Sequence, residues 1–260
     1  MIFETHAHYD DEAFDGDREA VLEEIHANGV DYIVNCGANL RTSKQSIELA
    51  ESHDYIYAAA GVHPDDIGDL EGDGLDVIRE LASYKKCLAI GEIGLDYHWD
   101  KFPRDKQREG FVRQWELAIE LDKPIEIHSR DAAADTFDIV RDMYEKEKAK
   151  GRALRADMHC YSYSLEQALE YEKMGLYFGV GGVVTFKNAK KLHEVVRAIP
   201  LTRILLETDC PYLAPEPFRG SRNNSGYITR VVEKLAELKE VSAEEVYAVT
   251  MQNAKTFFGL

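Results

Sequence analysis

The chain has few cysteines and no long apolar run. Its four cysteines lie far apart and without CxxC spacing: Cys36, Cys87, Cys160 and Cys210. This pattern favours reduced thiols, so we expect an intracellular, cytoplasmic protein. No apolar stretch is long enough to cross a bilayer, and no basic segment followed by an apolar one precedes the first apolar run. We therefore expect no membrane association and no secretory leader.

Positive charge is also scarce. The 260 residues include 31 Lys and Arg against 48 Asp and Glu, which gives a formal net charge of −17. Proteins that coat or scan nucleic acid bind it through Lys and Arg that neutralise phosphates, so this charge excludes that class. An enzyme that handles one phosphodiester at a time is compatible with the charge, because bound dications supply positive charge locally.

Two common catalytic or cofactor motifs are missing as well. A Gly-rich GxGxxG turn does not follow the first apolar run, which weakens the case for a doubly wound dinucleotide-binding fold. A GxSxG elbow and a Ser-His-Asp order are absent, so serine catalysis has no support.

Short apolar runs alternate with amphipathic stretches along the whole chain. The runs expected as strands are residues 2–5, 32–35, 55–60, 87–90, 125–127, 156–158, 176–180 and 204–206. The stretches expected as helices are residues 18–28, 43–52, 75–84, 104–121, 134–150, 165–174, 189–199, 228–238 and 243–257. This alternation predicts repeated βαβ units and a parallel sheet. With eight runs and no linker, we expect an α/β fold, a single (β/α)8 TIM barrel that forms one domain over residues 1–260.

Residues of the kind that bind metals follow these runs one after another. His6 and His8 share a face where the first run ends, because residues two apart in a strand point the same way. The ends of four later runs carry Glu92, His128, His159 and Asp209. In a (β/α)8 barrel the C-terminal strand ends meet at one edge, where active sites lie. The pattern predicts a metallohydrolase site at these strand ends.

Each histidine also has a structural interpretation. A single histidine at a strand end is more often hydrogen-bonded than metal-bound, but six such residues in one pattern favour the metal site. His63 ends the third run as either a substrate contact or a donor to a ligand, with a packed loop histidine as the alternative. His26, His53 and His193 fall in helical stretches and are expected at the surface.

Six segments resemble the TatD-related metal-dependent deoxyribonucleases. They are residues 5–8 (THAH), 61–64 (GVHP), 89–97 (AIGEIGLDY), 127–132 (IHSRDA), 159–162 (HCYS) and 207–215 (ETDCPYLAP). The resemblance runs the length of the chain and implies an amidohydrolase-type barrel with divalent metals that cuts phosphodiesters in DNA. The chain departs from the family pattern at Tyr163, where glycine is usual, and at Asn224–Ser225, where an acid and a proline are usual.

The resemblance also implies a set of ligands for two metals. It makes His6, His8 and Asp209 ligands of one ion. His128 and His159 hold the other, and Glu92 bridges the pair. The ions would be Mg²⁺, Mn²⁺ or Zn²⁺, and two dications about 3.5–4 Å apart activate water for attack on a phosphodiester.

The remaining site residues are expected to handle proton transfer and substrate. Asp209 is the candidate acceptor for the proton of the attacking water. Guanidinium groups match phosphate geometry, so the candidate phosphate contacts are Arg130, Arg219 and Arg222, each with a surface ion pair as the alternative. Tyr161, Tyr97 and Trp99 are candidates for stacking on an unpaired base.

Three functions compete. The first is a nuclease that trims DNA ends or single strands and needs no obligate protein partner. The second is an amidohydrolase-type hydrolase of a small lactone, cyclic amide or phosphoester. Such barrels often bridge their metals with a carboxylated lysine after the fourth strand, and Glu92 at that place favours the nuclease. The third is a noncatalytic binding barrel, which would not need the complete set of ligands that this chain carries.

Overall fold

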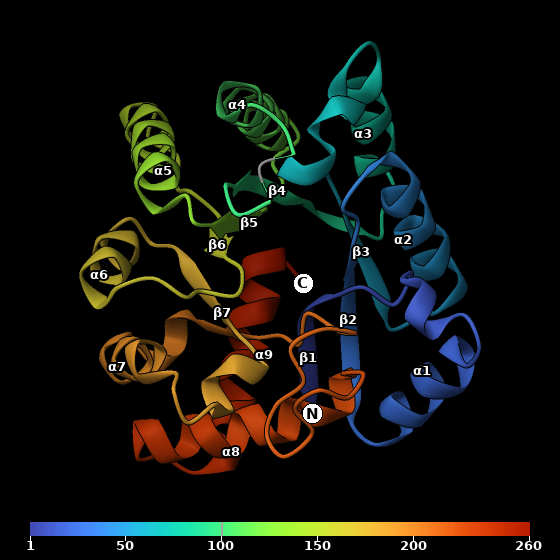
Figure 1. Ribbon diagram of the computed structural model, residues 1–260, viewed down its shortest axis with the longest axis vertical. Helices are drawn as coiled ribbons and strands as arrows, with labels where there is room; N and C mark the ends of the chain where they lie inside the picture. The colour runs from blue at the N-terminus through green and yellow to red at the C-terminus, as the bar shows by residue number, and fades with distance from the viewer. Residues whose placement is uncertain (100) are drawn as a thin grey trace. The chain divides into compact units, whose positions relative to one another are not determined.

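The computed structural model describes residues 1–99 and 101–260 (Figure 1). Its strands are β1 (Ile2–Ala7), β2 (Val30–Cys36), β3 (Ile56–Ala60), β4 (Cys87–Asp96), β5 (Ile125–Arg130), β6 (Ala156–Met158), β7 (Tyr177–Val180) and β8 (Ile204–Leu206). Its α-helices are α1 (Arg18–Ala27), α2 (Leu40–Ser52), α3 (Gly74–Ala82), α4 (Arg104–Glu120), α5 (Ala133–Ala149), α6 (Leu165–Lys173), α7 (Lys190–Ala198), α8 (Ile228–Lys239) and α9 (Ala243–Phe258). All eight predicted strands and nine predicted helices are confirmed.

The order of the strands in the sheet is the order of the chain, β1 to β8. Their pairing is parallel, and an α-helix follows each strand. This is the topology of a (β/α)8 barrel, as the sequence predicts.

The contacts between residues divide the chain into two compact units. Unit 1 contains Met1–Asn35, Cys160–Glu172 and Tyr177–Leu260, and unit 2 contains Cys36–His159 and Lys173–Leu176. Each unit therefore has its own part of the sheet and its own helices. A single domain over residues 1–260 stays a prediction.

Unit 1 is organised around β1, which pairs with β2 and packs beside β8. Helix α9 contacts both β1 and β8, and α8 packs against α9. The ring of Phe3 stacks on that of Phe258 at 5.6 Å between centroids, with both side chains buried. This apolar contact joins the first strand to the last helix, so residues from both ends of the sequence form one core.

In unit 2, helix α4 supports the ends of β3 and β4. Gln107 and Gln114 lie seven residues apart on its buried face. The Gln114 side chain accepts from the backbone N–H of Val62 at 2.8 Å and donates to its carbonyl at 2.9 Å. The Gln107 side chain likewise accepts from the backbone N–H of Asp96 at 2.9 Å and donates to its carbonyl at 3.0 Å. Each glutamine thus satisfies backbone groups where a strand ends.

Strand β4 differs from the prediction in its length. Its pairing with β5 is irregular between Ile90 and Ile93, but the ladder resumes and continues to Asp96. The resumption requires Gly94, because a Cβ there would lie 1.9 Å from the carbonyl oxygen of His128. Glu92 and His128 therefore lie within their strands, and the expectation that they mark the strand ends was wrong.

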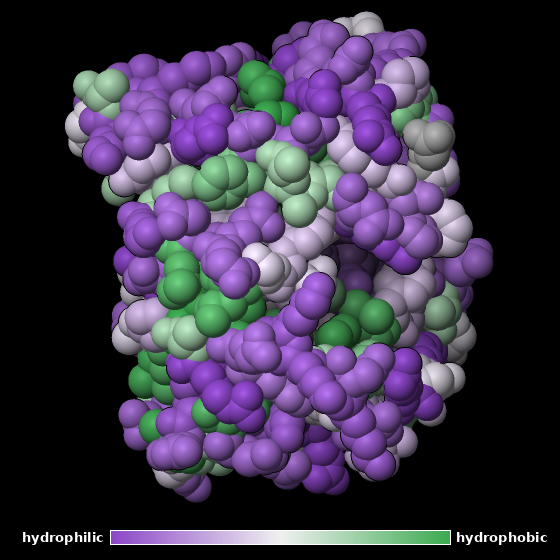
Figure 2. All heavy atoms as spheres, turned by 60° about the vertical axis from the view of Figure 1, so that its left-hand side comes forward, coloured by the Kyte–Doolittle hydropathy of each residue, from purple (hydrophilic) through white to green (hydrophobic). Residues whose placement is uncertain are grey.

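Short 3₁₀ helices occupy several connections that the sequence pattern does not resolve: Glu12–Phe14, Pro64–Leu70, Gly182–Thr185, Leu201–Arg203 and Ser225–Tyr227. The face of the molecule in Figure 2 is mostly hydrophilic, with separate smaller apolar patches. Over the described part of the chain, no helix combines the length and the apolar character needed to cross a membrane.

Candidate metal centre

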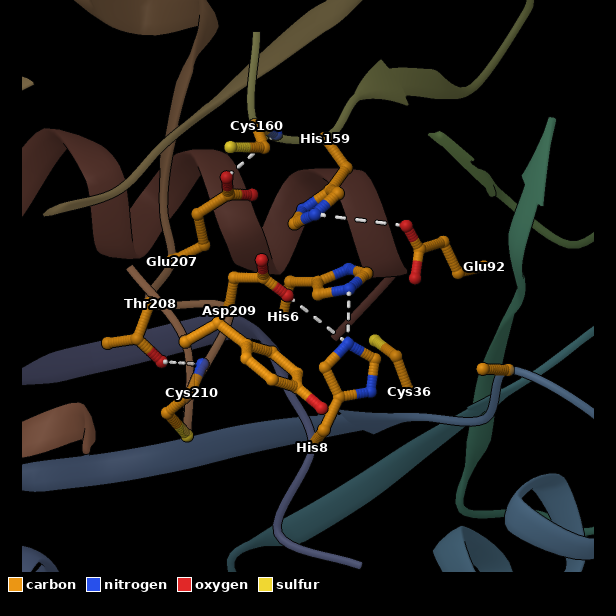
Figure 3. A network of polar contacts seen from close by, with 12 residues as sticks. His6, His8, Cys36, Glu92, His159, Cys160, Glu207, Thr208, Asp209 and Cys210 are labelled. Atoms are coloured by element: carbon orange, nitrogen blue, oxygen red, sulfur yellow. Dashed lines mark hydrogen bonds and ion pairs between the residues drawn. The ribbon is translucent and has the colours of Figure 1, made fainter. Parts of the chain in front are cut away.

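Unit 1 brings together His6, His8 and Asp209 (Figure 3). The Nε2 atoms of His6 and His8 are 3.2 Å apart, and His8 Nε2 lies 3.3 Å from Asp209 Oδ1. His6 is buried, while His8 and Asp209 are partly exposed. The predicted sharing of one face by His6 and His8 is thus seen in the structure, with a carboxylate beside them.

Backbone hydrogen bonds between β1 and the segment after β8 hold this triad. The amide of Asp209 donates to the carbonyl of His6 at 3.0 Å, and the amide of His8 donates to the carbonyl of Cys210 at 2.9 Å. The buried carboxylate of Glu4 adds three bonds, from the amide of His6 and from the amide and hydroxyl of Thr208. Burial, which these bonds only partly oppose, raises the pKa of Glu4 to about 8.

Unit 2 contains a second cluster around Glu92 in β4. His128 Nδ1 lies 2.7 Å from Glu92 Oε1, and His159 Nε2 lies 3.9 Å from the same oxygen (Figure 3 shows the second contact). The ring of His63 meets that of His128 edge-on at 4.2 Å between centroids. His63, Glu92 and His128 offer ligand atoms within 4.8 Å of one another.

Asp96 is a member of this cluster that the sequence analysis missed. Its Oδ2 lies 3.0 Å from His128 Nε2, and its Oδ1 accepts from the amides of His98 and Trp99 at 2.8 Å and 3.3 Å. Burial alone would raise the pKa of Asp96, but the bonds from His128 and from the two amides lower it to about 2. Burial likewise disfavours charge on His128, but Glu92 and Asp96 raise its pKa to about 9.

The alternation of side chains between the two faces of β4 is the signal that could have identified Asp96. It lies four residues after Glu92, so the two side chains share a face if the strand continues past Glu92. The predicted strand ended at residue 90, so the shared face of Glu92 and Asp96 was not recognised.

The donor atoms fit divalent metals. Two imidazoles and one carboxylate, as in His6, His8 and Asp209, are the three-ligand set that catalytic zinc sites use with one position left for water. Imidazoles also suit manganese, whereas magnesium prefers oxygen ligands. The second cluster pairs imidazoles with Glu92 in the same way, so the chemistry of both clusters agrees with a metal centre.

The three arginines predicted to contact phosphate have different environments. Arg130 and Arg219 are exposed, with their guanidinium groups 5.4 Å from the Trp99 ring and 4.3 Å from the Phe186 ring. Arg222 makes two bonds of 2.7 Å to the carboxylate of Asp17. The ion-pair alternative therefore describes Arg222 in this structure, and its contact with phosphate stays a prediction.

Two further candidates can be judged from their contacts. Tyr161 is 3% exposed, donates its hydroxyl to the carbonyl of Ser164, and packs edge-on against Phe178. Base stacking needs an exposed ring face, which a buried Tyr161 does not offer, and the substrate contact expected of Tyr161 stays a prediction. His63 Nδ1 accepts from the amide of Asp65 at 3.1 Å, which places the proton of a neutral ring on Nε2.

The topology and the clustered imidazoles and carboxylates define the class as metal-dependent hydrolases. The chain belongs to the TatD related DNase family, whose model matches residues 3–259. It is 48% identical over 258 residues to the uncharacterized metal-dependent hydrolase YabD of Bacillus subtilis, with 99% of each chain covered. It is 31% identical over 252 residues to the 3'-5' ssDNA/RNA exonuclease TatD of Escherichia fergusonii, with 95% of each covered.

A solved structure agrees with this assignment. The crystal structure of YJJV, a TatD homologue from Escherichia coli K12, matches with a TM-score of 0.91 and 30% sequence identity. The match covers 100% of this chain and 98% of that one. The family resemblance predicted from the sequence is thereby confirmed.

Proposed function

We propose that the protein is a metal-dependent nuclease that hydrolyses phosphodiester bonds in DNA, trimming single strands or frayed ends. The observation that carries the proposal is the His6, His8 and Asp209 triad, whose ligand atoms all lie within 4.8 Å of one another. The family match and the relative named as a 3'-5' ssDNA/RNA exonuclease support DNA as the substrate class.

We assign two divalent ions to the chain, Mg²⁺, Mn²⁺ or Zn²⁺. His6, His8 and Asp209 would hold one ion, and His128 and His159 the other. The sharing of Glu92 by both ions follows from the family resemblance. Such ions would neutralise charge on the phosphate and lower the pKa of the attacking water.

The protein's own side chains would move the proton and hold the substrate. Asp209 accepts the proton of the attacking water, since its carboxylate belongs to the triad and is partly exposed. His63, with its proton on Nε2, donates a hydrogen bond to a phosphate oxygen. Arg130 and Arg219 bind phosphates of the strand, because both guanidinium groups are exposed and lie beside aromatic rings.

Ends and single strands suit the charge of the molecule. A chain of net charge −17 binds a long duplex poorly, so its contacts with DNA must be few and local. We propose a cytoplasmic protein, because its four cysteines are free, as is usual where thiols are kept reduced. We also propose that it acts without an obligate protein partner.

The test is an assay of metal-reconstituted protein on end-labelled single-stranded and duplex DNA, beside a panel of lactones, cyclic amides and small phosphoesters. We expect stepwise shortening of the single strand, slower trimming of the duplex, and little turnover of the panel. Fast turnover of a lactone or cyclic amide with intact DNA would establish the amidohydrolase-type alternative instead.

A further inference from the structure

The segment that follows β4 presents an exposed aromatic ring beside an exposed arginine. Trp99 is 59% exposed, and the Arg130 guanidinium lies 5.4 Å from its ring centroid. His98 meets Trp99 edge-on at 4.9 Å, and its Nδ1 lies 3.0 Å from Asp131 Oδ2. The chain therefore displays a large π surface to solvent next to a positive charge.

The neighbouring Tyr97 is not equivalent to Trp99. It is partly buried, its hydroxyl donates to Asp135 at 2.6 Å, and the Arg104 guanidinium lies 4.2 Å from its ring centroid. Its hydroxyl and one ring face thus serve contacts within the protein. Trp99 also has a guanidinium beside its ring, but it is 59% exposed, so it offers more ring surface to a ligand than the partly buried Tyr97 does.

The backbone of this segment is tied to the second metal cluster. Asp96 holds the amides of His98 and Trp99 with one carboxylate oxygen, while its other oxygen lies 3.0 Å from the ring of His128. Gln107 fixes Asp96 itself through its backbone amide and carbonyl. One buried carboxylate therefore sets Trp99 at a fixed place relative to a candidate metal ligand.

We propose that Trp99 is a stacking platform for an unpaired base of the DNA strand, and that Arg130 holds a phosphate next to that base. The proposal rests on the proposed function, since the base belongs to the strand whose phosphodiester is cut. An aromatic side chain can stack on any of the four bases, because every base has a π face. The platform thus explains how an acidic protein holds a single strand with few phosphate contacts, and why paired bases in a duplex interior bind less well.

Intrinsic fluorescence provides a direct test, because the two tryptophans differ completely in exposure. Trp115 is fully buried in α4, so a ligand that stacks from solvent quenches Trp99 alone. Metal-loaded protein is titrated with short oligothymidylate carrying phosphorothioate linkages, and with the abasic oligomer of the same length. We expect quenching by oligothymidylate, none by the abasic strand, and none in Trp99→Phe. Quenching that persists in Trp99→Phe, or equal quenching by the abasic strand, would overturn the proposal.

Kinetic measurements distinguish the contribution of the base to binding from that of the phosphate. Trp99→Ala should raise KM for single-stranded DNA by about fivefold to a hundredfold, as loss of about 1–3 kcal/mol implies, with kcat nearly unchanged. On a strand that is abasic throughout, the variant should equal the wild type. Arg130→Ala should raise KM on both strands. The matched control is Tyr84→Ala, which removes another exposed aromatic ring (44%) and should change neither constant.

The outcomes distinguish this proposal from the function on which it rests. If the wild type cuts DNA and Trp99→Ala matches it on base-bearing strands, the platform is wrong and the nuclease assignment stands. If the wild type cuts no nucleic acid, the nuclease assignment is wrong. In that case, base-dependent quenching of Trp99 would still support a stacking site. If that quenching is also absent, both the stacking platform and the nuclease function are wrong.

Discussion

The carboxylate of Glu92 lies between two imidazoles of unit 2, 2.7 Å from His128 and 3.9 Å from His159. We expect Glu92→Ala to lower hydrolysis at least about a thousandfold and to reduce metal content, because an entire charged ligand is lost. Circular dichroism should show a folded chain. Glu120→Ala, an exposed control in α4, should keep full activity. A Glu92→Ala protein with full metal content and activity would contradict the bridging role.

The two ligand clusters can be tested separately by removing one imidazole from each. We expect His6→Ala and His128→Ala each to retain about one ion per chain, since the untouched cluster keeps its ligands. Elemental analysis of the purified variants gives the counts, and His53→Ala, from outside both clusters, should retain two ions. If both variants lose the same ion, a double variant carrying both substitutions would still retain about one ion per chain. That result would refute this division of ligands.

The cysteines should differ in reactivity according to burial. Cys87 and Cys210 are buried, which raises the pKa of both thiols, that of Cys87 to about 12. At pH 8 only about one Cys87 thiol in ten thousand would be ionised, and it is the thiolate that reacts. We expect iodoacetamide to modify the partly exposed Cys160 first, as read by peptide mass spectrometry. Faster labelling of Cys87 in folded protein would contradict this.

At the scale of secondary structure, α4 determines how two strands end. Gln114→Ala would leave the buried amide and carbonyl of Val62 without the partners they have now, at a cost of about 1–3 kcal/mol for each group. We expect the free energy of unfolding to fall by about 2–6 kcal/mol in urea titrations. Gln252→Ala, an exposed helical control, should change it by less than about 0.5 kcal/mol. An unchanged midpoint for Gln114→Ala would show that this helix does not anchor β3.

The sequence predicts the positions of the eight strands and nine α-helices because short apolar runs alternate with helical stretches along the chain. It does not predict the extent of β4, since the ladder is interrupted beside Gly91 and then resumes, which apolar runs alone do not reveal. It also gives no sign that Gln107 and Gln114 face inward, because a glutamine in a helix is equally consistent with a solvated face. These side chains are buried only because backbone groups of distant strands face them.

In the site, too, some features could be predicted from the sequence and others depend on the folded chain. The alternation of side chains along a strand was enough to place His6 beside His8, and the ends of later apolar runs indicated Glu92 and Asp209. The pairing of Arg222 with Asp17 and the burial of Tyr161 depend on residues far away in the chain or on neighbouring loops. Residue type alone indicates what such side chains can bind, whereas only the folded chain shows what already binds them.

At the scale of the whole molecule, the net charge of −17 constrains how DNA is held. If Arg130 and Arg219 are the main phosphate contacts, log KM for a single strand should change with log salt by a slope of about 1–2, because each phosphate contributes about 0.7. Arg219→Ala should reduce that slope and raise KM more than it lowers kcat. Efficient cleavage of closed circular duplex, undiminished by salt, would rule out end trimming.

The two clusters of candidate metal ligands also differ in how far apart their residues lie in the sequence. His63, Glu92, His128 and His159 all precede residue 160, whereas the triad of unit 1 joins His6 and His8 to Asp209, about two hundred residues later. Synthesis on the ribosome proceeds from the N-terminus, and domains acquire structure in that order. The residues of the unit 2 cluster are therefore available to a nascent chain well before the triad can close. A chain that stops short of Asp209 lacks the triad, so under the two-ion assignment proposed above complete metal loading would report that translation has passed the eighth strand.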